Sequence, residues 1–166
     1  RILQNSTFEH SGRFYHGWWQ EIPSAYRKYI TISGKLTEEE DFSGIHIRML
    51  YAFEDIELGS EDTYLIEGYG AKYRKQVKVA LNTIINAKTK EKAINSINRE
   101  LALPKNKTAK DLFNQLELKH PKIAKYFATG IGIQLQYKDS IIAEKVILSL
   151  ARDNIVALSL IHISEP

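Results

Sequence analysis

The chain has 166 residues, of which 43 % are hydrophobic and 26 % are charged, and its formal net charge at pH 7 is +3. These values predict one globular domain with a single core, and the mildly basic charge is compatible with a nucleic-acid partner. The chain has no cysteine, which excludes disulfides and thiolate metal sites and favours a reducing compartment, the cytoplasm. No apolar run approaches the roughly 20 residues that a membrane-spanning helix needs, so no membrane partner is expected.

The sequence of the first part of the chain predicts an irregular segment, a hairpin and a helix. Residues 1–27 are rich in aromatic side chains and are expected to be irregular or partly helical. Residues 29–32 alternate in the manner of a strand, residues 33–34 signal a turn, and residues 36–42 can pair back as a second strand. Ser43 is expected to cap the short helix that follows.

The rest of the chain predicts mainly helices. Apolar residues recur at helical spacing in five segments, which cover residues 61–87, 89–101, a stretch beginning at 108, 120–127 and 134–151. The first of these is expected to break near Gly68 and Gly70, and Thr89 is expected to cap the second. Thr108 with Asp111 forms the pattern of a capping box for the third. A strand is expected at residues 155–157.

The two ends of the sequence look foreign to a natural protein. The chain starts without methionine, and residues 158–166 resemble the translation of a transposon adapter used in sequencing libraries. We therefore expect a truncated domain at 1–157, a non-native tail at 158–166, and a natural protein that continues differently after about Ala157. The alternative is a true terminal strand, since this stretch is apolar enough to form one.

One acidic residue stands at a position suited to metal binding. Asp41 lies where the second expected strand meets the following helix, from which a carboxylate can project past the sheet edge. Carboxylates in such places hold Mg²⁺ in enzymes of phosphoryl transfer. The alternative, a simple helix cap, is the commoner role for an acidic residue before a helix.

A polar stripe runs along the first long helix. Arg74, Lys78, Asn82 and Asn86 are four residues apart and share one helix face. A pair of cations at this spacing can hold a triphosphate and stabilise the charge on a transferred group. The alternative is a solvated surface, which is the usual role of such a stripe.

Short motifs connect these residues in a fixed order. They are Gly12-Arg13, Gln-Glu-Ile-Pro at 20–23, Asp-Phe-Ser-Gly-Ile-His-Ile-Arg at 41–48, the Arg74 and Lys78 pair, and Leu135-Gln136. The order and spacing resemble the polymerase domain of family A DNA polymerases, the bacterial DNA polymerase I type. The resemblance extends over about residues 12–157.

The resemblance implies an α/β fold of the α+β kind, with a small antiparallel palm sheet and a mostly helical fingers-like region over about residues 61–101. In that family the aspartate matched by Asp41 binds Mg²⁺, together with the backbone carbonyl of the residue matched by Phe42. Arg74 and Lys78 match the residues that contact the phosphates of the incoming nucleoside triphosphate. Asp41 is accordingly the candidate catalytic residue.

Other positions carry over with changes. Arg13, Arg48 and Gln136 match positions that contact the primer–template nucleic acid. His46 and Asn82 match nucleotide-binding positions of the family but differ in residue type. The DNA-synthesising members have a glutamate where this chain has His46, and the family has an aromatic residue where this chain has Asn82. The choice between DNA and RNA therefore stays open.

The function implied by the resemblance is template-directed nucleotidyl transfer with Mg²⁺ as cofactor, which would make the full-length protein an enzyme. The family's second metal-binding carboxylate, in a His-Asp motif after the last strand, has no counterpart in this sequence. The chain as given is therefore expected to turn over little or not at all. Two alternatives remain: a catalytically inactive nucleic-acid-binding module with a polymerase-like fold, and a helical interaction domain whose matches are accidental.

Overall fold

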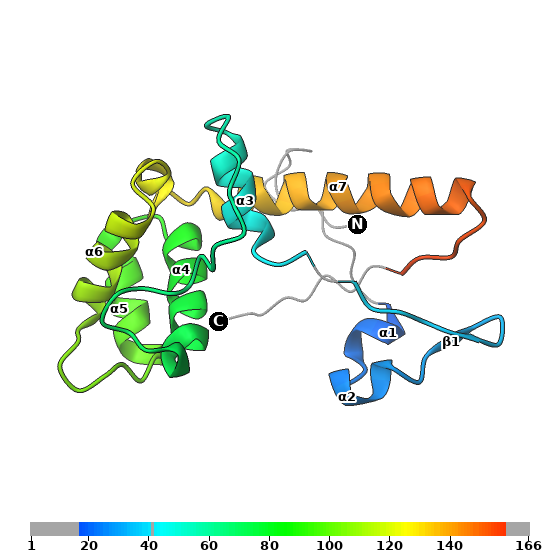
Figure 1. Ribbon diagram of the computed structural model, residues 1–166, viewed down its shortest axis with the longest axis horizontal. Helices are drawn as coiled ribbons and strands as arrows, with labels where there is room; N and C mark the ends of the chain where they lie inside the picture. Colours follow the sequence, from blue (N-terminus) through cyan, green and yellow to red (C-terminus); the bar gives the residue numbers. More distant parts are fainter. Residues whose placement is uncertain (1–16, 41, 159–166) are drawn as a thin grey trace. The chain divides into compact units, whose positions relative to one another are not determined.

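The computed structural model describes residues 17–40 and 42–158, and Figure 1 shows their helices and strands. The described residues are about 55 % helical and include a small two-stranded antiparallel sheet, so the fold is of the α+β kind. The chain forms two compact units. We call Gly44–Ile133 the helical unit, and the described residues before and after it the hairpin unit.

The hairpin unit confirms the expected turn but shortens the strands. β1 (Thr31–Ile32) pairs antiparallel with β2 (Lys35–Leu36), and Thr31 lies opposite Leu36. Ser33 and Gly34 have φ angles of 51° and 77°, as a two-residue turn of the type favoured in hairpins requires. The acidic run that follows β2 does not extend the second strand to residue 42, since glutamate has low strand propensity.

Two short helices precede the hairpin, as the partly helical prediction for this region allows. They are α1 (Trp18–Glu21) and α2 (Ser24–Arg27). Arg27 is 8 % exposed, and its Nε donates to the Ile22 carbonyl at 3.1 Å while its Nη1 lies 3.2 Å from a Glu39 carboxylate oxygen. This side chain therefore ties the second helix to the acidic run after β2.

The last helix is as expected, whereas the last strand is not found. α7 (Gly132–Arg152) covers the predicted 134–151. Residues 155–157 lie outside regular structure, and Ile155 and Val156 are 53 % and 62 % exposed. A strand needs a partner for its backbone hydrogen bonds, and no strand pairs with this stretch in the described part of the chain.

The helical unit is built on three mutually packed helices. They are α4 (Arg74–Asn86), α5 (Lys90–Glu100) and α6 (Ala109–Lys119), which lie together in Figure 1. Their apolar faces form a core of fully buried side chains: Leu81, Ile84, Ile85, Ile97, Leu112, Phe113 and Leu116. α3 (Ile45–Ala52) adds Ile47 and Leu50 to the buried set.

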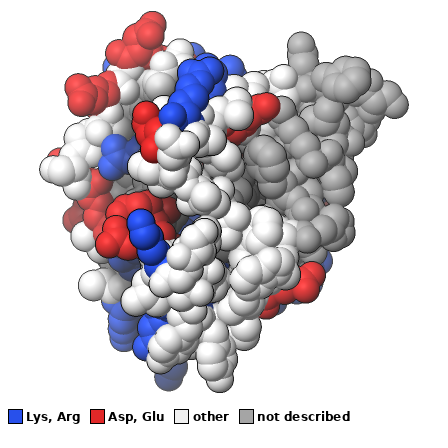
Figure 2. Space-filling model, turned by 90° about the vertical axis from the view of Figure 1, so that its right-hand side faces the viewer, with Lys and Arg blue, Asp and Glu red and all other residues white. Residues whose placement is uncertain are grey.

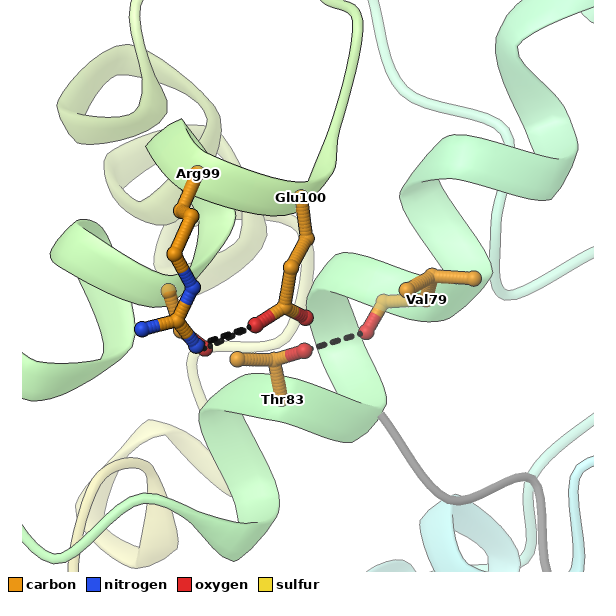
Figure 3. Close-up of polar contacts among 5 residues, drawn as sticks. Val79, Thr83, Arg99 and Glu100 are labelled. Carbon is orange, nitrogen blue, oxygen red and sulfur yellow. Dashed lines mark hydrogen bonds and ion pairs between the residues drawn. The ribbon is translucent and has the colours of Figure 1, made fainter.

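Polar side chains at the α4–α5 edge are satisfied within their own helices. Figure 3 shows Thr83, whose hydroxyl donates to the Val79 carbonyl at 3.0 Å, and the pair of Arg99 and Glu100. Arg99 Nη2 lies 2.6 Å from Glu100 Oε1, and Ser96 Oγ donates to the same oxygen at 2.8 Å. None of these three hydrogen bonds joins α4 to α5, and both helices contribute buried apolar side chains to the core.

Helix starts in this unit follow the sequence signals in two of three cases. The Thr89 hydroxyl accepts from the Lys92 N–H, and Thr108 with Asp111 forms the expected capping box. The prediction that Ser43 caps α3 is off by one, because the cap is Gly44 with a φ of 64°. The left-handed backbone there suits glycine and would strain a serine.

Two predicted helices are much shorter than expected. The long helix over 61–87 begins only at Arg74, after one 3₁₀ turn η1 (Ala71–Tyr73). Gly68 has a φ of 79°, which ends any helix before it, and Tyr64, Ile66 and Tyr69 are buried from an irregular segment instead. The helix expected at 120–127 is reduced to the 3₁₀ turn η2 (Ala124–Tyr126).

Among the described residues, no helix combines the length and the apolar character that crossing a membrane requires.

The capping box gives a first testable prediction. Thr108→Ala removes the hydroxyl that accepts from the Asp111 N–H at 3.1 Å, so the free energy of unfolding should fall by about 1 kcal/mol. Urea unfolding followed by circular dichroism measures the change. Lys110→Ala, at an exposed position of the same helix turn, should change it by less than about 0.5 kcal/mol. Equal losses in the two variants would contradict the role of the cap.

Candidate functional site

The start of α4 concentrates positive charge. Lys72, Arg74, Lys75 and Lys78 are all exposed and follow one another within two turns. The first turn of α4 holds no acidic residue, and the cap residue Tyr73 gives no side-chain hydrogen bond to it. Cations next to the positive end of a helix dipole are unfavourable for the isolated helix, whereas an anion bound there is favourable. This end of α4 is therefore suited to a phosphate group.

Arg74 is held by a residue from the preceding loop. Its Nε lies 2.5 Å from Asp62 Oδ2, and its guanidinium carbon lies 5.1 Å from the centre of the Tyr64 ring. The other Asp62 oxygen accepts from the Tyr64 N–H at 2.9 Å. These two hydrogen bonds, that of Arg74 first, lower the pKa of Asp62, while the Asp62 carboxylate raises the pKa of Arg74. The guanidinium is thus fixed in position yet exposed to solvent.

Lys78 lies one turn further on the same helix face and is exposed. Among the described residues, no carboxylate pairs with it. Asn82 is half-buried, and the Asn86 amide donates to the Asn82 carbonyl at 2.9 Å. The polar stripe therefore consists of two exposed cations, Arg74 and Lys78, and two amides. The second amide, that of Asn86, forms a hydrogen bond within its own helix.

The other candidate residues are spread over the chain. His46 and Arg48 lie on α3, where His46 is half-buried and Arg48 Nη1 donates to the Leu58 carbonyl at 3.3 Å. Phe42 is 62 % exposed, and Gln136 is a half-buried residue of α7. Arg13 and Asp41 lie outside the described residues. The geometry thus brings Arg74 and Lys78 together, and it leaves the predicted pairing of Asp41 with these cations a prediction.

The magnesium site also stays a prediction. The described residues contain no group of three His, Asp or Glu side chains that could hold a metal ion, and Asp41 lies outside them. The assignment of Asp41 and the Phe42 carbonyl as ligands therefore depends on the sequence resemblance alone.

Asp62 and Tyr64 are the residues of this site that the motifs do not predict. An aspartate that accepts from the backbone N–H two residues later is a common turn signal, and it is present here as Asp62-Thr63-Tyr64. A second signal is charge patterning, because residues 54–67 contain six acidic residues and no basic one. Both signals could have marked this loop as a partner of the basic helix.

A buried histidine fixes the same loop. His120 is 1 % exposed, its Nε2 lies 3.0 Å from the Thr63 carbonyl, and its Nδ1 lies 3.0 Å from the Tyr51 hydroxyl. Burial lowers the pKa of His120, so the ring is neutral at pH 7. Because Thr63 stands between Asp62 and Tyr64, this hydrogen bond also anchors the residues that hold Arg74.

Surface charge is mixed beyond this helix end. On the face drawn in Figure 2, Lys and Arg side chains lie beside Asp and Glu side chains, and neither sign covers that face. Binding of an anion therefore has to be argued from particular side chains, and Arg74 and Lys78 are the pair that the geometry favours.

Comparison of the chain with models of protein families, with curated proteins and with solved structures gives no match.

Proposed function

We propose that this chain belongs to a template-directed nucleotidyltransferase in which the start of α4 binds the triphosphate of the incoming nucleotide. The observation that carries the proposal is the pair of exposed cations, Arg74 and Lys78, on one face of a helix whose first turn has no acidic residue. The planar guanidinium of an arginine presents several N–H donors that match phosphate oxygens, and a lysine one turn away adds a second positive charge.

The remaining roles are proposed on the sequence resemblance. Asp41 and the Phe42 carbonyl would hold Mg²⁺, which in such enzymes neutralises charge on the phosphates. The small hairpin would correspond to part of the palm sheet, and α4 with α5 to a fingers-like region. Arg13, Arg48 and Gln136 would contact the primer–template.

A second candidate is a nucleic-acid-binding module with this fold but without catalysis. It is favoured by three departures from the family's pattern. His46 stands where the DNA-synthesising members have a glutamate, Asn82 where the family has an aromatic residue, and Asn86-Ala87 where the family has Tyr-Gly. The Asn86 amide donates to the Asn82 carbonyl at 2.9 Å, so one of its donors is already used within the helix. Under this alternative the chain binds oligonucleotides but shows no selective affinity for a nucleoside triphosphate.

Nucleotide titration tests the proposal. Arg74→Ala and Lys78→Ala should each weaken binding of a fluorescent methylanthraniloyl ATP, in buffer with MgCl₂, by about tenfold, since a hydrogen bond to a charged group contributes about 1.5 kcal/mol or more. Fluorescence anisotropy of the labelled nucleotide measures the dissociation constant.

Lys92→Ala is the matched control, because it removes an exposed lysine from the first turn of α5. It should change the dissociation constant by less than about twofold, as expected for a screened surface charge. An equal loss in Lys92→Ala and Arg74→Ala would show that binding follows net charge, and the proposed site would then be wrong.

A further inference from the structure

The helical unit divides sharply by charge along the chain. Residues 54–67, which we call the acidic segment, carry Glu54, Asp55, Glu57, Glu61, Asp62 and Glu67 without any Lys or Arg. Residues 68–133 carry fourteen Lys and Arg against four Asp and Glu. The basic helices therefore follow, in the same chain, a loop of opposite charge. The density of negative charge in that loop resembles that of a polyanion.

The acidic segment contacts the basic part at three points. Asp62 pairs with Arg74 at 2.5 Å, Glu61 with Lys119 at 3.6 Å, and Glu54 with Lys125 at 2.7 Å. In the Asp62 pair a backbone N–H holds the second carboxylate oxygen and the Tyr64 ring lies beside the guanidinium, just as the Tyr126 hydroxyl and ring support the pair of Glu54 and Lys125. Only the Asp62 pair involves a cation of the α4 start. The charge of Lys119 contributes further to the lowered pKa of Asp62.

We infer that the Asp62 carboxylate is an intramolecular competitor for the phosphate that Arg74 binds, and that the acidic segment thereby limits nucleotide affinity. The inference rests on the proposed function of the α4 start. A phosphate on Arg74 has either to replace Asp62 at the Nε–H or to bind the Nη–H groups beside a carboxylate of the same sign of charge, so Asp62 weakens its binding in both cases. Lys78 has no such competitor among the described residues, so it offers a first contact before Arg74 is released.

The ion pair between Asp62 and Arg74 can be displaced at little cost in stability. The Arg74 side chain is 44 % exposed and that of Asp62 27 %, so water screens the pair and its contribution to stability is small. The Asp62 bond to the Tyr64 N–H does not involve Arg74, and it can persist after the guanidinium turns to a phosphate. Nucleotide binding therefore does not require the acidic segment to unfold.

Removing the competing charge should tighten binding. Asp62→Asn keeps a side-chain oxygen for the Tyr64 N–H and removes the negative charge, so the dissociation constant of methylanthraniloyl ATP should fall by about two- to fivefold, the range of an exposed ion pair. Asp62→Ser, whose hydroxyl can accept the same bond, is the second variant and should behave alike. Urea midpoints of both variants verify that they are folded.

Glu67→Gln is the matched control, because it removes one exposed negative charge from the same segment and takes part in none of the three pairs. It should leave the dissociation constant within about 1.5-fold of wild type. In the Arg74→Ala background, Asp62→Asn should then have no effect, since the double-mutant cycle removes the shared interaction.

Two results separate this inference from the proposal beneath it. If Asp62→Asn and Glu67→Gln tighten binding equally, or if the effect persists without Arg74, the competitor role of Asp62 is overturned while the nucleotide site stands. If Arg74→Ala leaves wild-type affinity unchanged, the proposed function itself fails.

Discussion

Leu116→Ala should lower the free energy of unfolding by about 2–5 kcal/mol, the range for a leucine truncated in a packed core. Leu116 is fully buried in the core that α4, α5 and α6 share. Truncation removes apolar area and leaves a cavity that the surrounding helices fill only in part. Equilibrium unfolding in urea measures the loss as a shift of the midpoint at constant slope.

The same helix supplies a control of the same chemistry. Leu118 lies two residues further on α6 and is 72 % exposed, so Leu118→Ala should change the free energy of unfolding by less than about 0.5 kcal/mol. A loss of similar size at both positions would contradict the core described for the helical unit. It would also remove the basis for treating α4 as a rigid support of Arg74 and Lys78.

Local signals predicted the helices that carry the candidate site. Thr89 and Thr108 mark the starts of α5 and α6 because their hydroxyls satisfy backbone N–H groups within the same turn. The four-residue spacing of Arg74 and Lys78 likewise places both on one face of α4. Such features depend on neighbours within about one helix turn, and the sequence displays those neighbours directly.

Tertiary contacts decided what the sequence could not predict. The glycines alone predict the break near Gly68, whose φ is 79°, whereas the irregular path of residues 61–70, from which Tyr64 and Tyr69 are buried, depends on tertiary contacts. The partner of Arg74 is Asp62, twelve residues earlier, and the turn between them brings the two together. A helical pattern over the whole stretch would have placed Asp62 and Arg74 on one rigid helix, about 18 Å apart along the axis.

The proposed metal-binding role of Asp41 is based on the sequence resemblance. The motif around Asp41 predicts a metal-binding carboxylate near the hairpin, and Asp41 lies outside the described residues. The cationic half has a geometric basis, because Arg74 is both positioned and exposed. Measurements on Arg74, Lys78 and Asp62 therefore test the nucleotide site independently of the metal.

His120→Leu should lower the free energy of unfolding at pH 7 by about 2–4 kcal/mol, because it leaves two buried polar groups without a partner. Nε2 of His120 must donate to the Thr63 carbonyl, since a carbonyl can only accept. In the neutral ring Nδ1 then accepts from the Tyr51 hydroxyl, at 3.0 Å. The substitution removes both bonds and with them the anchor of the acidic segment at Thr63.

The same histidine should make stability depend on pH. Burial is the main cause that lowers the pKa of His120 in the folded protein, so below the ordinary histidine pKa of about 6.5 the unfolded chain binds more protons. The contribution is complete above pH 6.5 and is lost as the pH falls toward the folded pKa, by at most about 1.4 kcal/mol per pH unit. Urea unfolding between pH 7.5 and pH 5 measures this slope.

Two variants distinguish the effect of protonating His120 from the effect of losing its hydrogen bonds. His120→Leu should be less stable at pH 7 and should lose this part of the slope, because the titrating group is gone. Tyr51→Phe should lower the free energy of unfolding by about 1–3 kcal/mol through the unpaired Nδ1, and it should keep a slope, because His120 is still buried. The carboxylates with lowered pKa values, Asp62 and Asp111 among them, lose their contribution only at more acidic pH. If His120→Leu retains the wild-type slope between pH 6.5 and pH 5, protonation of the buried ring is not its source, and the neutral ring holding Thr63 is the wrong account of this loop.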